Sequence, residues 1–257
     1  MKRLILFLAF IPPMALAAGS WDGTWRTKVE SIKTTGKPDV YEVSGGQFQC
    51  LTCVPPIAVP ADGKDHAVTG HPYYDTYAVQ IHDPMSIEST SKLKGVLMFT
   101  DKMSVSADHN TLTESLADHS GAKVATATVT SKRASPGKTG SHAISGSWQQ
   151  GTASDASDTG ITVTMQSTEN GLKMTWNGIV TDAKFDGKPV AAVGDPGHTM
   201  AALTKVSADT IEETDTRDGK IVDVSRSTLA KDGQSLSVVD HDKLHDITTT
   251  YTMLRVH

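Results

Sequence analysis

The second half of the sequence repeats the first half about 124 residues further along the chain. Asp62-Gly63-Lys64 returns as Asp186-Gly187-Lys188, and Ser86-Ile87-Glu88 returns as Thr210-Ile211-Glu212. Residues 62–118 align with their counterparts without a gap, and about a quarter of the pairs are identical. A period of this length corresponds to a whole small domain, whereas solenoid units have about 20 to 50 residues. The sequence therefore predicts a duplicated small domain.

Short stretches of β-branched residues with alternating polarity run through both halves, for example 96–105 and 221–229. Turn pairs such as Asn177-Gly178 and Asp218-Gly219 separate these stretches at intervals of about 8–12 residues, which is typical of all-β folds. No segment of about 12 residues or more has a helical stripe of apolar residues, so we expect little helix.

These patterns predict an all-β protein made of two tandem antiparallel β-barrels. A single large β-sandwich or barrel built from both repeats is the alternative. The segment 134–145 is rich in small polar residues and is predicted to be a linker. The first barrel would then span residues 18–133 and the second residues 146–257.

The first 17 residues have the pattern of a secretory signal peptide. Lys2 and Arg3 precede an apolar run over residues 4–10, and Ala15-Leu16-Ala17 forms a cleavage site. Two prolines interrupt the apolar run well short of the ~20 residues that a membrane span needs. We therefore predict a periplasmic or secreted protein with no integral membrane segment.

The balance of charges excludes one class of partner. Without Lys2 and Arg3, 22 of the 24 basic residues remain against 29 acidic residues, which gives a net charge of about −7. The basic residues form no cluster that could neutralise phosphates, and this electrostatic contribution dominates affinity for nucleic acids. Nucleic acids and anionic membrane surfaces are therefore predicted not to be partners.

Each repeat begins with a Gly-x-Trp motif and ends with a basic residue. Gly23-Thr24-Trp25 begins the first repeat and Gly146-Ser147-Trp148 the second, whereas Arg133 and Arg255 lie on the predicted last strands. This combination resembles the signature of the lipocalins, or calycins. In that family the Trp closes one end of an antiparallel barrel of about eight to ten strands, and the basic side chain lies across its ring.

The resemblance implies a structural role for four or five residues. Trp25 would pair with Arg133 or Lys132, and Trp148 would pair with Arg255. Such a cation–π contact would fasten the first strand of each barrel to the last strand.

The two cysteines, Cys50 and Cys53, are predicted to form a disulfide bond, which is the usual state of cysteines in an exported protein. A redox-active dithiol is one alternative, but such motifs begin a helix, and this pair lies in a turn before Pro55 and Pro56. Metal binding is a second alternative.

The ten histidines raise the question of a metal site. His241 and His245 lie four residues apart, which on a strand separates the two imidazoles by ~13 Å, too far to share one ion. His66 and His71 lie in the loop over residues 62–72 and are predicted to be exposed. Zinc or copper binding in that loop is the alternative, and no cofactor or metal is predicted.

Three tyrosines follow that loop in the first repeat, namely Tyr73, Tyr74 and Tyr77. They are the predicted ligand-binding residues, because aromatic side chains at a barrel mouth could receive a small molecule. The second repeat has Gly197, His198 and Ala201 at these positions, so any such site is predicted to belong to the first repeat. A hairpin corner with a purely structural role is the alternative for the loop.

The sequence contains none of the common catalytic motifs, such as a Gly-x-Ser-x-Gly elbow, a His-Glu-x-x-His pair or a phosphate-binding loop. The pair Glu212-Glu213 is predicted to be solvated rather than a general acid–base couple, because neighbouring residues of a strand face opposite sides. We therefore predict a non-enzymatic binding protein that holds a small apolar or amphipathic ligand in a barrel. A structural or envelope-interaction module with solid barrels is the alternative, and an enzyme with its site at the repeat-one mouth is the third hypothesis.

Overall fold

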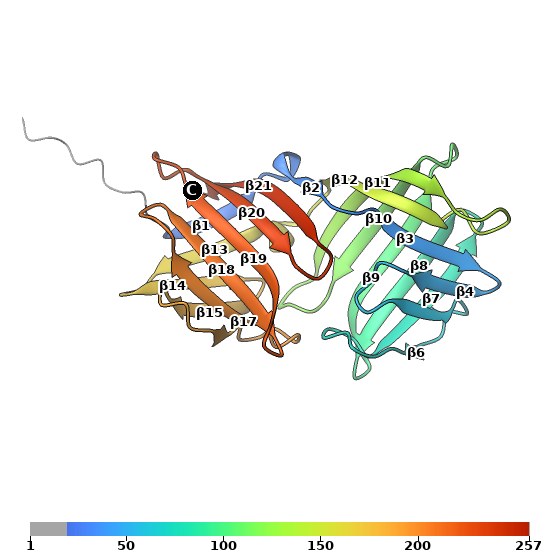
Figure 1. Cartoon of the computed structure of the whole chain (residues 1–257), viewed down its shortest axis with the longest axis horizontal. Helices are drawn as coiled ribbons and strands as arrows, with labels where there is room; N and C mark the ends of the chain where they lie inside the picture. Colours follow the sequence, from blue (N-terminus) through green and yellow to red (C-terminus); the bar gives the residue numbers. More distant parts are fainter. Residues whose placement is uncertain (1–19, 257) are drawn as a thin grey trace, which may run out of the picture.

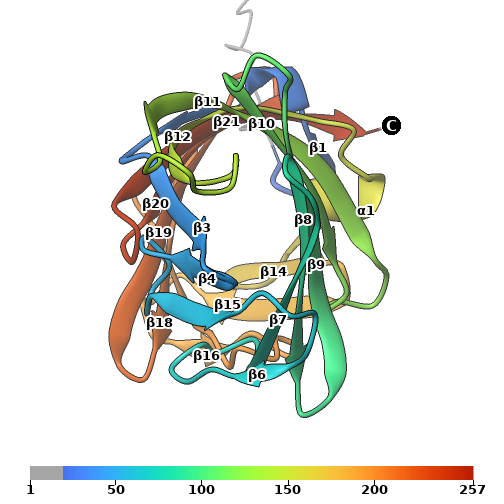
Figure 2. The same cartoon turned by 90° about the vertical axis from the view of Figure 1, so that its right-hand side faces the viewer.

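The computed structural model describes residues 20–256 and contains two antiparallel β-barrels that lie side by side (Figure 1). Each barrel is a sheet of ten strands that curls round a common interior, as the end-on view of one of them shows (Figure 2). The predicted all-β fold with two barrels is therefore confirmed. The predicted signal peptide, residues 1–17, lies outside the described residues.

We call the two barrels the N-barrel and the C-barrel. The N-barrel contains, in spatial order, β5 (Ile57–Pro60), β4 (Gln47–Cys50), β3 (Asp39–Ser44), β12 (Gly146–Ser154), β11 (Ala125–Pro136), β10 (Thr111–Asp118), β9 (Val96–Val105), β8 (Ser86–Leu93), β7 (Thr76–Asp83) and β6 (His66–Ala67). The C-barrel contains β15 (Ile179–Lys184), β14 (Gly171–Trp176), β13 (Thr162–Ser167), β1 (Gly23–Thr27), β21 (Ile247–Val256), β20 (Ser235–Asp242), β19 (Lys220–Leu229), β18 (Thr210–Arg217), β17 (Met200–Lys205) and β16 (Val190–Ala191).

Three short elements lie at the junction between the barrels. They are the 3-10 turn η1 (Val29–Ser31), the strand β2 (Lys33–Thr35), which pairs with β21, and the single-turn helix α1 (Asp158–Ile161). The chain crosses from the C-barrel to the N-barrel after β2 and returns between β12 and α1.

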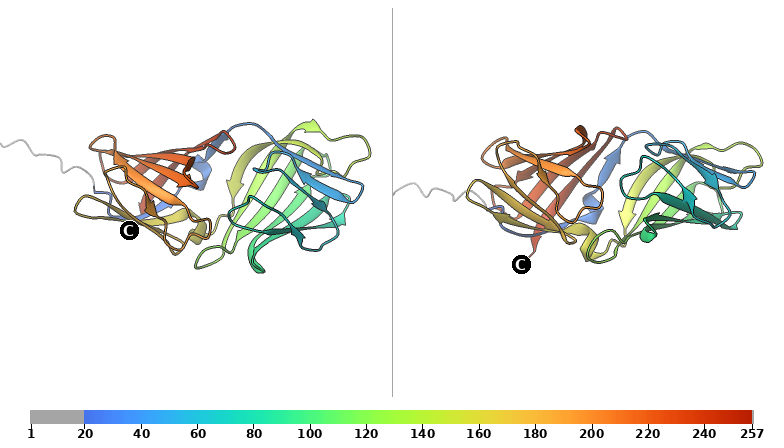
Figure 3. Two further views of the ribbon diagram at one scale, coloured as in Figure 1. Left: turned by 60° about the horizontal axis from the view of Figure 1, so that its bottom comes forward. Right: turned by 90° about the horizontal axis from the view of Figure 1, so that it is seen from below.

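The first strand of each repeat completes the barrel of the other repeat. β1 pairs with β21 and β13 in the C-barrel, whereas β12 pairs with β11 and β3 in the N-barrel. Seen from below, β1 lies within one barrel and the yellow-green β12 within the other (Figure 3). The two repeats have therefore exchanged their first strands within one chain.

This exchange corrects the predicted domain boundaries. The N-barrel is one continuous segment from β3 to β12, residues 39–154, and it is inserted into the C-barrel between β2 and β13. The predicted linker, residues 134–145, is instead the end of β11 and its connection to β12 within the N-barrel. The division into 18–133 and 146–257 followed composition, which does not determine which strands pair.

The two Gly-x-Trp motifs close the outer ends of the barrels, far from the crossings. Trp25 and Trp148 are completely buried. The guanidinium of Arg255 lies 4.2 Å from the ring centre of Trp25, and that of Arg133 lies 3.9 Å from the ring of Trp148. The implied pairs are therefore corrected to Trp25–Arg255 and Trp148–Arg133. The reason is that β1 and β12, which carry the tryptophans, are exchanged between the repeats, whereas β11 and β21, which carry the arginines, are not. Lys132 takes no part in either pair.

The loop shared by the two repeats closes each barrel on its other side. Gly63 N–H donates to the carbonyl of Val79 at 2.8 Å, and Gly187 N–H donates to the carbonyl of Leu203 at 3.0 Å. Both glycines have positive φ values, 75° and 71°, which favour a residue without a side chain. These contacts bridge β5 to β7 and β15 to β17, so the Asp-Gly-Lys turn has a structural role in both halves.

The exchange makes cleavage in the predicted linker a direct test of the architecture. We expect protein cut at a protease site inserted between Thr139 and Gly140 to remain one particle in native size-exclusion chromatography. The two fragments would stay joined because each contributes a strand to the barrel of the other. β12 of the second fragment pairs with β11 of the first, and β1 of the first fragment pairs with β21 of the second. Two particles of about half the size, eluting without denaturant, would contradict the exchange.

Candidate functional site

A cavity of about 290 Å³ lies inside the C-barrel. Its walls include Thr27 at the end of β1 and Gly160 and Ile161 of α1, which places it at the barrel end that faces the N-barrel. The indole N–H of Trp176 donates to the carbonyl of Gly160 at 3.2 Å and fixes α1 against this end. The side chains that matter most for its chemistry are those of Met165, Met174, Trp176, Ile211, Glu213 and Tyr251.

The register of β18 to β21 arranges the inward side chains of the C-barrel in layers. From the tryptophan-closed end towards the crossings, successive layers are Ile211, Ser227, Val238 and Tyr251; then Glu213, Ser225, Asp240 and Thr249; then Asp215, Asp223, Asp242 and Ile247. The cavity therefore has apolar side chains on its inner side and Glu213 in the next layer, and the layer with Asp215, Asp223 and Asp242 lies beyond it towards the crossings.

At two inward positions the N-barrel has a larger side chain than the C-barrel. Met103 pairs with Glu114 as Ser227 pairs with Val238, so Met103 and Ser227 are equivalent. Tyr77 pairs with Ser91 as Ala201 pairs with Asp215. Ser227 lines the cavity of the C-barrel, at the position that the larger Met103 occupies in the N-barrel.

The acidic layers are electrostatically unusual because carboxylates are buried close to one another. Burial and then the charges of Asp215, Asp223 and Asp240 raise the pKa of Glu213 to about 8. Burial and the neighbouring Asp240 raise the pKa of Asp223 to about 8, and burial raises the pKa of Asp215 to about 6 against the opposing effect of Arg217. Burial also raises the pKa of Asp240. At neutral pH, Glu213 and Asp223 therefore hold protons for much of the time.

The carboxyl group of Glu213 has no hydrogen-bonding partner among residues 20–256, since the contacts of this stretch go to Glu212. Its side chain is partly buried and lines the cavity. One carboxylate oxygen of Asp215, Oδ1, is fully buried and also lacks a partner. Asp101 Oδ1 in the N-barrel is likewise fully buried without a partner. Buried polar groups are normally hydrogen-bonded, so these carboxyl groups are unusual, and among them Glu213 is the one that lines the cavity of the C-barrel.

The position of Glu213 corrects the prediction that the pair Glu212-Glu213 is solvated. Glu212 faces outward and accepts a hydrogen bond from Arg226 Nη2 at 2.5 Å. Glu213 faces inward because it lies two residues from the buried Ile211 on the same strand. The alternation around Ile211 is the sequence signal that would have identified it.

The N-barrel contains a smaller acidic group. Burial raises the pKa of Glu114 to about 7, and Tyr41 donates a hydrogen bond to Glu114 Oε1 at 3.3 Å. Burial and the charge of Glu114 raise the pKa of Asp101. The carboxyl group of Glu114 therefore has a hydrogen-bond donor, Tyr41, whereas that of Glu213 has none among the described residues.

The three predicted ligand-binding tyrosines do not form one pocket. Tyr77 stacks on Phe48 inside the N-barrel, with ring centres 6.0 Å apart, and its hydroxyl donates to Ser89 Oγ at 3.0 Å. Tyr74 stacks on His71 at 4.6 Å. A ligand-binding role for these tyrosines stays a prediction.

Tyr73 instead joins the two barrels. Arg217 Nη2 of the C-barrel donates to the Tyr73 hydroxyl at 3.1 Å, and the guanidinium lies 4.9 Å from the Tyr73 ring centre. The ring also lies against Gly197, where a Cβ atom would be 2.5 Å from Tyr73 Cζ. Tyr73 and Tyr74 line a groove of about 410 Å³ between the barrels, together with Arg217 and His245.

The predicted disulfide between Cys50 and Cys53 is confirmed. It lies at the end of β4, and Cys50 is buried while Cys53 packs at the edge of the same core. Met174 takes the equivalent place in the second repeat, since Met165 pairs with it as Tyr41 pairs with Cys50. The barrel therefore forms in the second repeat without a disulfide.

The histidines that suggested a metal site contact carboxylates one at a time. His66 Nε2 lies 2.8 Å from Asp62 Oδ1, and His245 Nδ1 lies 2.6 Å from Asp242 Oδ2. His241 lies 3.6 Å from Asp246. Within residues 20–256, no group of three or more His, Cys, Asp or Glu residues is placed to hold a metal ion.

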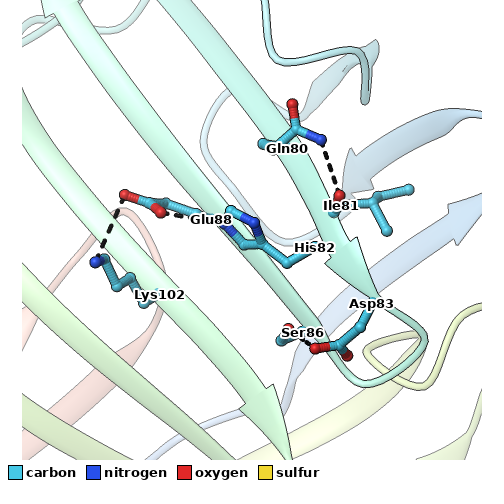
Figure 4. Close-up of polar contacts among 7 residues, drawn as sticks. All are labelled: Gln80, Ile81, His82, Asp83, Ser86, Glu88 and Lys102. Carbon is cyan, nitrogen blue, oxygen red and sulfur yellow. Dashed lines mark hydrogen bonds and ion pairs between the residues drawn. The ribbon is translucent and has the colours of Figure 1, made fainter.

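The outer face of the N-barrel carries polar contacts between neighbouring strands (Figure 4). His82 Nε2 lies 3.2 Å from Glu88 Oε2, and Lys102 Nζ lies 4.0 Å from Glu88 Oε1. The side chains of His82 and Lys102 are 50% and 67% exposed, so water screens these pairs. At the adjacent turn, Ser86 donates to Asp83 at 2.7 Å. These contacts support the register of β7 to β9, and we assign no chemistry to them.

Comparisons with known proteins identify no family for this chain. No protein-family profile matches it, and no curated protein matches it. Among solved structures, a double mutant of the vaccine antigen Transferrin Binding Protein B from Haemophilus parasuis Hp5 aligns with 88% of this chain at 7% identity and a TM-score of 0.23. The alignment covers 44% of that structure, so this chain spans less than half its length. At this TM-score the likeness carries no argument about function.

Because the second repeat forms its barrel without a disulfide, we expect the first repeat to tolerate the loss of the Cys50–Cys53 bond. We expect the double variant Cys50→Ser, Cys53→Ser to keep its fold and to lose modest stability, about 1–2 kcal/mol, because the bond closes a very short loop. Urea unfolding followed by circular dichroism measures the change. Loss of cooperative unfolding in the variant would contradict the inference from Met174.

The buried acid predicts a pH-dependent stability difference. The pKa of Glu213 is higher in the folded protein, about 8, than its ordinary value of 4.5. Below pH 4.5 the group is protonated in both the folded and the unfolded state and does not change the free energy of unfolding. Between pH 4.5 and about 8 it destabilises the folded state increasingly, because the unfolded state ionises first. We expect Glu213→Gln to be near neutral at pH 5 and to raise the free energy of unfolding by ~1–2 kcal/mol at pH 8.5.

Glu212→Gln is the matched control for this measurement, because it makes the same change one residue away on the outer face. We expect its effect to be small at both pH values, since an exposed ion pair contributes little. Equal pH profiles for Glu213→Gln and the unmodified protein would contradict the assignment of Glu213 as a buried acid.

Proposed function

We propose that this protein is an exported, non-enzymatic binding protein that holds a small amphipathic molecule inside the C-barrel. The observation that carries the proposal is the cavity of about 290 Å³, which has apolar side chains deep in the barrel and an unpartnered carboxyl group, Glu213, nearer its mouth. Ligand sites in proteins are concave, mostly apolar and equipped with a few polar groups that orient the ligand.

The proposal moves the ligand site from the first repeat to the second. Ser227 lines the cavity where the first repeat has the larger Met103, and the second repeat has Ala201 at the position of Tyr77. The aromatic residues that suggested a repeat-one site fill that barrel or join the two barrels, which favours a supporting role for the N-barrel.

We further propose that both barrels are of the lipocalin type. The arginine over a buried tryptophan at the closed end of each barrel supports this, as does the position of each tryptophan on a strand that pairs with the arginine strand. A barrel closed at one end leaves the other end for ligand entry.

Export is part of the proposal. It rests on the signal-like pattern of residues 1–17 and on the Cys50–Cys53 disulfide, since structural disulfides persist in oxidising compartments. Among residues 20–256, no helix has the length and apolar character needed to span a membrane.

The cavity can be tested with a neutral probe that fluoresces in apolar surroundings, N-phenyl-1-naphthylamine. We expect saturable binding of one probe per protein. Ser227→Met introduces the residue that the first repeat has at this position and should weaken binding at least ~10-fold by filling the cavity. Fluorescence titration measures both affinities.

Ser237→Met is the matched control, because it makes the same substitution on the exposed outer face of β20. We expect it to bind the probe as the unmodified protein does. Absence of saturable binding in the unmodified protein, or equal binding by Ser227→Met, would contradict the proposed function.

A further inference from the structure

The second repeat has acidic residues at four inward positions where the first repeat has none. Glu213, Asp215, Asp223 and Asp240 occupy the positions of Ser89, Ser91, Phe99 and Leu116, as the matching registers of the two sheets establish. Both repeats form the same barrel, so the fold does not require these four carboxyl groups. Their cost to stability points to a role in binding.

The chain supplies little positive charge to this group. Arg217 at the barrel mouth lowers the pKa of Asp215, but its guanidinium also donates to Thr199 Oγ1 at 3.1 Å and to Tyr73. His241, which acts on Asp240, lies 3.6 Å from Asp246. In the part of the chain that the structure describes, no cation lies within ion-pair distance of Glu213.

An enclosed carboxylate without a partner is costly, and a cation bound beside it would offset this cost. A neutral ligand would leave the negative charge of the ionised carboxylate uncompensated. A metal ion would need several oxygen ligands around one point, and the described residues provide no such group. The remaining class is a small organic cation.

The surroundings of Glu213 suit an amphipathic cation. Ile211 and Val238 lie one layer deeper in the barrel and offer apolar contact, and Trp176 and Tyr251 line the same cavity. Aromatic faces attract ammonium groups. A volume of about 290 Å³ holds roughly fifteen to eighteen non-hydrogen atoms.

We propose that the ligand of the C-barrel is a small organic amine, whose ammonium group lies against Glu213 and whose apolar part occupies the deeper layer. This inference rests on the proposed function. Asp240 lies in the same layer as Glu213, two strands away, and adds negative charge to this side of the cavity.

Three probes that share a phenyl ring and differ in charge test the inference: phenethylamine, 2-phenylethanol and phenylacetate. Isothermal titration calorimetry at pH 7.5 gives their affinities for the full chain. We expect phenethylamine to bind at least ~10-fold more tightly than 2-phenylethanol and phenylacetate to bind most weakly, because the acidic mouth repels it.

Variants assign the preference to Glu213. Glu213→Gln should abolish the preference for the amine and leave 2-phenylethanol unaffected, whereas Glu213→Asp should retain part of it. Glu212→Gln on the outer face should bind all three probes as the unmodified protein does. Affinity for the amine should also rise from pH 6 to pH 8 in the unmodified protein, as Glu213 ionises alongside Asp215, Asp223 and Asp240, and rise less in Glu213→Gln.

The outcomes separate this inference from the proposed function. If N-phenyl-1-naphthylamine binds but phenethylamine shows no advantage over 2-phenylethanol, the ligand class is wrong and the binding cavity stands. If phenethylamine keeps its advantage in Glu213→Gln, the assignment to Glu213 is overturned. If N-phenyl-1-naphthylamine itself does not bind, the proposed function fails.

Discussion

The pairing of β1 with β21, and of β12 with β11, is the constraint on which the rest of the structure depends. Each pair places a tryptophan of one repeat beneath an arginine of the other repeat, at 4.2 Å for Trp25 and 3.9 Å for Trp148. Neither barrel can close without a strand from the other half of the sequence. Because of this exchange the chain passes between the barrels twice, once after β2 and once between β12 and β13. The helix α1 lies on the second passage and forms part of the cavity wall.

Duplication allowed the two interiors to diverge on one framework. The apolar layer near each tryptophan is similar, with Ile87 and Leu112 in one barrel and Ile211 and Leu236 in the other. Nearer the crossings, the first repeat has aromatic side chains with the buried acids Asp101 and Glu114, whereas the second has Ser227 and a larger group of carboxyl groups. Free volume and buried charge therefore occur together in the C-barrel, which is the combination expected of a site that binds a polar ligand rather than of a packed core.

The sequence contained enough information to predict the fold class, the disulfide and the importance of the two Gly-x-Trp motifs, because these depend on local alternation and on the repeat. It did not determine which repeat contributes β1 to which barrel, since Trp25 has an equivalent arginine in either half. The ligand site was predicted at the tyrosines of the first repeat because aromatic residues are easily recognised in a sequence. A cavity arises from small residues such as Ser227, and only three-dimensional register shows that Ser227 faces Val238.

The exchange of strands can be tested most directly with two engineered cysteine pairs. Arg26 pairs with Leu254 in this structure, whereas barrels closed by their own first strands would pair Arg26 with Lys132. The account predicts that Arg26→Cys with Leu254→Cys forms a cross-link within one molecule, and that Arg26→Cys with Lys132→Cys does not, when peptides are mapped by mass spectrometry without reductant. Formation of the second cross-link in place of the first would contradict the account.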